Sequence, residues 1–172
     1  MKLKKCKVCK VEFEPLRPLQ SVCSPGCAYT KVSKLRIKTE KEAYKIEKDR
    51  IKTRSDWIKE VQHACNAYIR ARDRDQPCIS CGKRLEKGYH AGHFRPTTHA
   101  PTRFNEDNIH GQCIQCNLYL HGNTERYKES LVLRIGLDRV NKLFEPHEPA
   151  KWTIEDLKTM KTEFKLKLKA LL

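Results

Sequence analysis

The sequence has no long apolar run. No stretch approaches the roughly 20 apolar residues that a helix needs to cross a bilayer. The opening residues, MKLKKCKVCK, carry lysines without the apolar segment that follows such residues in a signal peptide. We therefore expect no membrane partner and a location in the cytoplasm, where cysteines are thiols rather than disulfides.

Large apolar side chains are also scarce. Aromatic residues make up 8% of the 172 residues, methionine and tryptophan occur twice each, and the mean hydropathy is -0.74. A chain of this length forms one ordinary domain or two small ones, without a large hydrophobic core. We expect a small, zinc-stabilised α+β protein in which bound metal supplies part of the folding energy.

Acidic residues are outnumbered. The chain has 36 Lys and Arg against 21 Asp and Glu, a formal charge of +15 and a pI near 9.5. This balance favours a polyanionic partner, because contacts with phosphates supply most of the sequence-independent affinity for nucleic acid. A solubilising surface or an anionic membrane would also suit the charge, but no basic amphipathic anchor helix stands out.

Eight of the nine cysteines form close pairs. Two CxxC pairs separated by 31 residues can together complete a closed tetrahedral zinc site of the structural kind. Redox-active dithiols are the alternative, although nothing like the strand and helix of a thioredoxin precedes either pair. The predicted ligands are Cys78, Cys81, Cys113 and Cys116.

The first quartet in the chain lies near its start, around a loop of 13 residues. Its spacing suits a small structural zinc ribbon or knuckle that stabilises the local fold and could contact DNA. Pairing of cysteines across the two quartets would need the long helices to fold back. Cys65 remains, and is most simply a small buried residue. The predicted ligands of this first quartet are Cys6, Cys9, Cys23 and Cys27.

Composition divides the chain into four predicted parts. They are an N-terminal zinc module at 1–30, a basic helical segment at 31–76, a core of short extended pieces at 77–128, and a C-terminal helical region at 129–172. A helix that starts near Cys113 should close the core.

Three helices have clear boundaries in the sequence. Residues 31–54 contain no glycine or proline and predict an exposed basic helix. A second helix should begin at Ser55, which resembles an N-cap, and pack on the core. A final helix at 154–172 should begin with a capping box formed by Thr153 and Asp156.

Residues suited to phosphodiester hydrolysis lie between Cys81 and Cys113 and directly after Cys116. Hydrolysis needs a base that activates water, a divalent cation, and a group that fixes the base. The run HAGHF contains His90 and His93, Asn108 follows fifteen residues later, and Asn117 comes directly after the last zinc cysteine. Other histidines, at 99, 110 and 147, are most simply packed or solvated residues.

The pattern resembles the HNH, or ββα-metal, nucleases, and among them the treble-clef recombination endonucleases of the endonuclease VII kind. The resemblance implies that His93 is the general base, that Asn108 holds its loop and ring, and that Asn117 binds a catalytic Mg²⁺ or Mn²⁺. The family places an acidic residue or histidine directly before the base, where this chain has Gly92. His90 is the first choice for the replacement ligand and His121 the second.

A closer resemblance covers nearly the whole chain. The N-terminal quartet, SDWIKEVQHACNAYIRARDRDQPCISCG, AGHF, RFNEDNIHGQC and the closing WTIEDLK are similar to the NinG, or Rap, family of lambdoid bacteriophages. This implies a structure-specific endonuclease that acts on Holliday junctions and D-loops in phage recombination, in the cytoplasm of the host cell.

Several expectations follow for binding and assembly. Arg95, Arg103 and the basic helix are candidate phosphate contacts. Symmetric cleavage of a junction requires two active sites, so we expect a homodimer formed by the long helices or the last one. A zinc-containing DNA-binding protein without catalysis would share the charge and the cysteines. A zinc protein that binds RNA is a further alternative, but the few aromatic residues do not cluster into a stacking surface.

Overall fold

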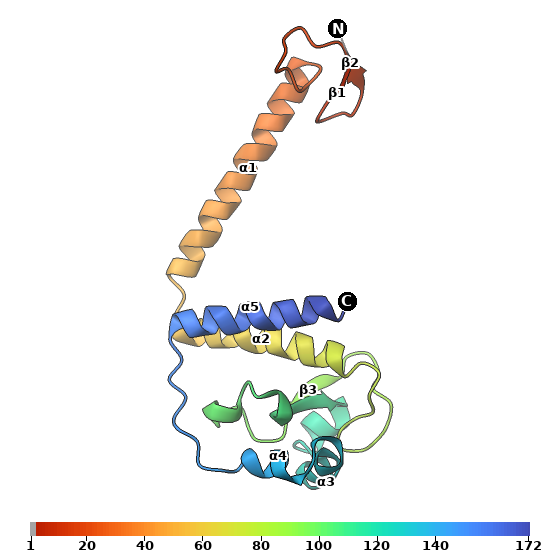
Figure 1. The fold of residues 1–172 in the computed structure, drawn as a ribbon, viewed down its shortest axis with the longest axis vertical. Helices are drawn as coiled ribbons and strands as arrows, with labels where there is room; N and C mark the ends of the chain where they lie inside the picture. The colour runs from red at the N-terminus through yellow and green to blue at the C-terminus, as the bar shows by residue number, and fades with distance from the viewer. Residues whose placement is uncertain (1–2) are drawn as a thin grey trace. The chain divides into compact units, whose positions relative to one another are not determined.

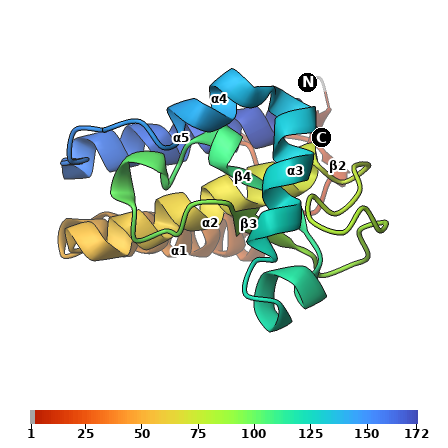
Figure 2. The same ribbon diagram turned by 90° about the horizontal axis from the view of Figure 1, so that it is seen from below.

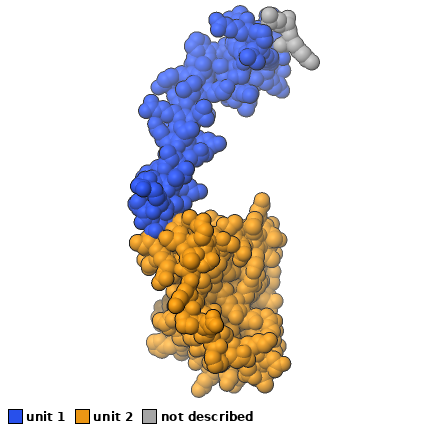
Figure 3. Space-filling model, turned by 60° about the vertical axis from the view of Figure 1, so that its left-hand side comes forward, with its two compact units in different colours: residues 1–52 blue, residues 53–172 orange. Residues whose placement is uncertain are grey.

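The computed structural model describes residues 3–172. The chain divides into two compact units, Met1–Lys52 and Thr53–Leu172 (Figure 3). The chain combines helices with two small sheets, as expected for an α+β protein. No helix among these residues is long and apolar enough to span a membrane. The boundary falls inside the basic segment expected at 31–76.

The first unit joins a short antiparallel pair, β1 (Lys4–Lys5) and β2 (Glu12–Phe13), to a long helix, α1 (Pro25–Arg50). The basic helix expected at 31–54 therefore starts six residues earlier and ends four residues earlier. It starts there because Ser24 caps it by accepting a hydrogen bond from the Cys27 N–H, and Pro25 suits the first helical position.

The second unit begins with helix α2 (Arg54–Arg72). Its N-cap is Thr53, so the prediction of Ser55 was wrong. Thr53 accepts a hydrogen bond from the Asp56 N–H at 3.2 Å, and the Asp56 carboxylate accepts one from the Thr53 N–H at 3.1 Å. This reciprocal capping box satisfies two N–H groups, which a cap at Ser55 would not do.

Helix α5 (Ile154–Ala170) lies beside α2 and runs in the same direction (Figures 1 and 2). It begins with the capping box of Thr153 and Asp156, as predicted. The two helices share the main hydrophobic core, which includes Trp57, Leu157 and Phe164. Burial of such side chains stabilises the fold by about 1.5–3 kcal/mol each.

A hairpin packs on the same core. Its strands, β3 (His90–His93) and β4 (Ile109–Gln112), are antiparallel, with His90 opposite Gln112 and His93 opposite Ile109. Ala91 and Ile109 point into the core with α2. Two short 3₁₀ turns, Ala100–Thr102 and Glu106–Asn108, lie in the loop between the strands.

A π-helical turn, η3 (Gln115–Tyr119), follows β4, close to the helix start expected near Cys113. After Leu120, the three residues His121, Gly122 and Asn123 all have positive φ angles, of 49°, 90° and 43°. Helices α3 (Thr124–Ile135) and α4 (Leu137–Lys142) then form a pair separated by Gly136. They cover a second, smaller core that contains Phe94 and Tyr127.

Candidate functional site

The second cysteine quartet joins the two sides of the hairpin. Cys78 and Cys81 precede β3, Cys113 follows β4, and Cys116 lies in η3. The Cys81 and Cys113 sulfurs are 3.8 Å apart, and the Cys113 N–H donates to the Cys78 sulfur at 3.3 Å. Burial works to raise the pKa of the Cys78 thiol, but the backbone N–H groups of Cys113, Cys81 and Ser80 lower it below its ordinary value.

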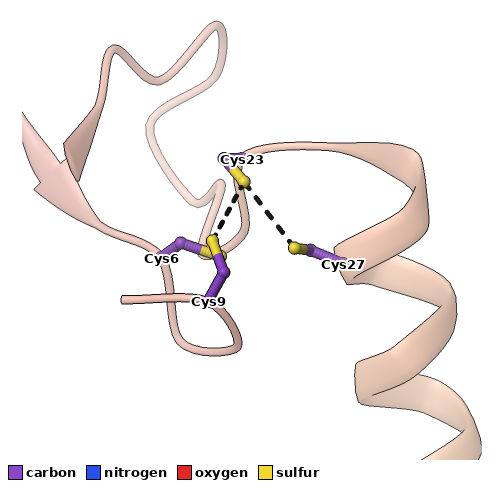
Figure 4. Close-up of side chains that lie close together, drawn as sticks. All are labelled: Cys6, Cys9, Cys23 and Cys27. Carbon is purple, nitrogen blue, oxygen red and sulfur yellow. Dashed lines mark hydrogen bonds between the residues drawn. The ribbon is translucent and has the colours of Figure 1, made fainter. Parts of the chain in front are cut away.

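The first quartet has the same arrangement in the other unit (Figure 4). Cys23 lies 3.5 Å from Cys9 and 3.7 Å from Cys27, sulfur to sulfur. Cys27 is supplied by the first turn of α1, which ties the helix to the cysteine loops. Burial opposes ionisation of the Cys6 thiol, yet N–H groups of Cys9 and Val8 lower its pKa to about 6.

The sulfur–sulfur distances in both quartets suit a tetrahedral zinc site. A Zn–S bond of about 2.3 Å places neighbouring sulfurs roughly 3.8 Å apart, whereas a disulfide needs about 2.05 Å. Within residues 3–172, these are the two groups of three or more His, Cys, Asp or Glu side chains close enough to share an ion. The quartets could therefore bind structural metal ions such as zinc, in the pairing expected from the spacing.

His90 and Asn117 meet beside the second quartet. The Asn117 amide donates a hydrogen bond to Nδ1 of His90 at 2.8 Å, and both side chains are partly buried. Asn117 follows Cys116 in η3, and its backbone N–H bonds to the carbonyl of Cys113. The cysteine knuckle thus fixes the position of Asn117 against β3.

His121, the second choice for a ligand, lies outside the helical turn that contains Asn117. The π-helical turn ends at Tyr119, and His121 is an exposed residue with a left-handed backbone. His121 therefore does not continue the helical turn of Asn117 and does not share its face. Of the two histidines, His90 is the one that the fold brings to Asn117.

Gly92 has no room for a side chain. A Cβ atom there would lie 2.9 Å from Cβ of Gln112, closer than such atoms approach in real proteins. Gln112 is fully buried, and its Nε2 donates to the Ser80 hydroxyl and to the Gly122 carbonyl, each at 2.6 Å. Gln112 therefore occupies the space that an acidic residue before His93 would need.

His93 is held from one side of its ring. Its Nε2 lies 3.1 Å from the carbonyl oxygen of Arg103 and 3.5 Å from the Gln62 amide. Because a carbonyl only accepts, Nε2 carries the proton and Nδ1 keeps a lone pair. Burial lowers the pKa of His93, partly offset by the hydrogen bond to the Arg103 carbonyl, so the ring is neutral at neutral pH.

Asn108 closes the loop between the strands. It is fully buried, its Oδ1 accepts from the Arg95 N–H at 2.7 Å, and its Nδ2 donates to the carbonyls of Arg95 and Thr102 at 3.0 Å each. Its own carbonyl accepts from the Phe94 N–H at 2.9 Å. The side chain holds the loop, as expected, but its hydrogen bonds do not reach the His93 ring, which the Arg103 carbonyl holds instead.

The two arginines expected to contact DNA already have protein partners. Arg95 donates to the Leu143 carbonyl and lies 5.2 Å from the centre of the Phe144 ring. Arg103 donates to the side-chain oxygen of Gln62 at 2.9 Å. Both are only partly exposed. Their guanidinium groups position the loop around His93.

Sequence reasoning missed several residues that build the site. Gln62 on α2 contacts both His93 and Arg103, and Gln112 fills the space at Gly92. A buried network also fixes β4. In it Asp73 accepts from the Gly111 N–H at 2.7 Å and pairs with Arg72, which donates to His110 at 2.9 Å. A glutamine or a lone Asp has no spacing pattern that would have revealed these roles.

Comparison with known proteins identifies the family. The family model described as the bacteriophage lambda NinG protein matches residues 1–172. The chain belongs to the NinG family. It is 43% identical to protein ninG of Escherichia phage lambda and 42% identical to protein ninG of Salmonella phage P22, each time over 98% of this chain and 93% of the relative. No solved structure matches this NinG chain.

Proposed function

We propose that this NinG protein is a divalent-metal-dependent DNA endonuclease of the HNH type. The observation that carries the proposal is the 2.8 Å contact between His90 on β3 and Asn117 in η3, beside a hairpin whose strands and loop also hold His93 and Asn108. This part of the chain thus combines the neutral imidazole of His93, the side chain of Asn108, which holds the loop, and two side chains that could bind a metal ion, His90 and Asn117. These are the groups that hydrolysis of a phosphodiester requires.

His93 is the general base in this proposal. With Nε2 protonated and bonded to the Arg103 carbonyl, Nδ1 can take a proton from a water molecule that attacks the phosphorus. Asn108 keeps the loop of Arg103 in place through Thr102 and Arg95, so it acts on the base by position. The lowered pKa keeps the base in its active, neutral form at neutral pH.

His90 and Asn117 are the proposed ligands of the catalytic ion. When bound, a divalent cation would stabilise the negative charge that develops on the phosphate. An imidazole nitrogen and an amide oxygen suit Mn²⁺ better than Mg²⁺, which prefers oxygen ligands in an octahedron. Because Gln112 fills the space at Gly92, His90 takes the place of the acidic residue or histidine that HNH enzymes have directly before the base.

Branched DNA is the proposed substrate, with Holliday junctions and D-loops of phage recombination as the main forms. The charge of +15 supports a nucleic acid partner, and the similarity to phage proteins named ninG supports a role in the phage. Symmetric cleavage of a four-way junction needs two sites, which favours a homodimer.

The test compares His93→Ala with a matched control, His99→Ala, on linear, nicked, three-way and four-way DNA with Mn²⁺ or Mg²⁺. His99 lies in the loop that follows β3, and it contacts Thr102 rather than His93. We expect His93→Ala to lower cleavage about 10²–10⁴-fold, the contribution of a general base, with zinc content and DNA affinity unchanged. A His93→Ala protein with normal turnover would refute the assignment.

A zinc-containing DNA-binding protein without catalysis is the rival proposal. The missing side chain at Gly92 favours it, because the ligand expected directly before the base is absent. It predicts that the wild-type protein binds junctions but leaves every substrate intact with either ion. The cleavage assay therefore decides between the two proposals.

A further inference from the structure

Lysines gather on one face of α1. They recur every three or four residues, and at 100° per residue these positions fall within an arc of about 100°. All six side chains are exposed, and four of them line one shallow groove on the helix. We call this set the lysine stripe; its members are Lys31, Lys34, Lys38, Lys41, Lys45 and Lys48.

The arginines of α1 lie away from the stripe. Arg36 pairs with Glu40 at 2.8 Å, and Arg50 pairs with Glu47 at 2.7 Å, each about one turn along the helix. Glu42 borders the stripe and is 3.9 Å from Lys38. The close ion pairs of the arginines therefore engage Glu40 and Glu47 and leave the lysine face strongly positive.

The lysine stripe destabilises α1 as an isolated helix. Like charges three or four residues apart repel each other, and the stripe contains five such neighbouring pairs. Of the 26 described residues of α1, none is buried, so packing does not compensate. Residues 1–52 carry 15 Lys and Arg against 6 Asp and Glu, a net +9 out of the +15 of the whole chain. A polyanion along the stripe would remove this repulsion.

We propose that the lysine stripe binds the sugar-phosphate backbone of duplex DNA, which makes Met1–Lys52 a second DNA-binding unit without sequence preference. This rests on the proposed DNA substrate but not on cleavage. From Lys31 to Lys48 the stripe extends about 25 Å. That length corresponds to about seven phosphates of one strand, at 3.4 Å each along the duplex axis. Lysine suits this role because it contacts phosphates as a mobile point charge.

The test uses two variants with the same loss of charge in the same helix. Lys38→Gln/Lys45→Gln alters the stripe, and Arg36→Gln/Arg50→Gln is the control. Affinity of the full, zinc-loaded chain for a linear 30-base-pair duplex is measured by anisotropy between 50 and 200 mM NaCl, without Mg²⁺ or Mn²⁺. The slope of log K against log salt is negative, and each lost phosphate contact makes it less steep by about 0.9. We therefore expect the slope of the stripe variant to be less steep by about 1.8. The control should change it by less than about 0.5.

Two results would overturn the proposal. One is an equal change in both variants, which would mean that net charge alone matters. The other is a stripe variant that keeps the wild-type slope, even if it loses binding to phosphatidylserine vesicles, which would indicate a membrane face instead. Lys38→Arg/Lys45→Arg, which keeps the charge, must keep the slope, and circular dichroism and zinc content must match the wild type. Loss of cleavage with intact binding would count only against the nuclease proposal.

Discussion

Gly92→Ala tests how tightly the hairpin is packed at the position before His93. The added methyl group would meet Gln112, whose Cβ lies 2.9 Å from the new atom. Gln112 cannot move away freely, because its amide is bonded to Ser80 and Gly122. Overpacking of this kind costs about 1–3 kcal/mol, and each weakened hydrogen bond costs about 1 kcal/mol. We expect the free energy of unfolding to fall by about 2–4 kcal/mol.

A double-mutant cycle isolates the contact. Gln112→Ala removes the obstructing side chain and is itself destabilising, since it leaves buried polar groups with fewer partners. In that background Gly92→Ala should cost less than about 0.5 kcal/mol, which gives a coupling energy of about 1.5–4 kcal/mol. Urea unfolding of the zinc-loaded protein, followed by tryptophan fluorescence, is a suitable assay. Both tryptophans, Trp57 and Trp152, lie in the second unit, so the signal reports that unit alone.

Additive effects would refute this reasoning. If Gly92→Ala costs the same with and without the Gln112 side chain, Gln112 is not what excludes a side chain at this position. Gly92→Asp provides a second check. We expect it to be at least as destabilising as Gly92→Ala and not to improve metal binding, because the carboxylate has no space beside His90.

The remaining predictions concern the metal sites and the base. Cys113→Ser should lose one of two zinc ions per chain and abolish cooperative unfolding of the second unit, whereas Cys6→Ser should lose one zinc and leave the tryptophan unfolding curve unchanged. Either variant with two zinc ions would contradict the quartets. Burial lowers the pKa of His93 from its ordinary value of 6.5. The stability that this group contributes is therefore present above pH 6.5 and lost as the pH falls through its folded pKa. The acid limb of the cleavage profile should also lie below pH 6.5. A nuclear magnetic resonance titration of the His93 ring with a midpoint at or above 6.5 would contradict this.

The sequence predicted the parts of the fold that short spacings control. The pairing of cysteines within each quartet is confirmed, because a CxxC loop places two thiolates on one ion whatever surrounds it. The capping box at Thr153 is local as well. The N-cap of α2, Thr53, was not predicted because the local sequence does not distinguish it from Ser55. Ser55 is an equally good N-cap residue on its own, and only the hydrogen bonds of Asp56 distinguish the two.

The candidate site depended on contacts that spacing does not encode. The meeting of His90 with Asn117 follows from the register of β3 and β4 and from the turn after Cys116. The hydrogen bond between His93 and the Arg103 carbonyl depends on how the Asn108 side chain closes the loop between β3 and β4. Gln62 and Gln112 act through three-dimensional packing, so no periodic pattern in the sequence marks them.

The left-handed turn at His121, Gly122 and Asn123 has a consequence for the order of folding. Non-glycine residues in this conformation cost about 1–3 kcal/mol each unless the surroundings hold them. Here the holding groups are Gln112 on β4, which binds the Gly122 carbonyl, and Cys116, whose sulfur accepts from the Asn123 amide. Asn123 is also the N-cap position of α3, yet its side chain makes no capping bond to that helix. Helix α3 therefore lacks a start signal of its own. We expect it to be placed late in folding, after the hairpin and the cysteine knuckle have formed the turn from which it begins.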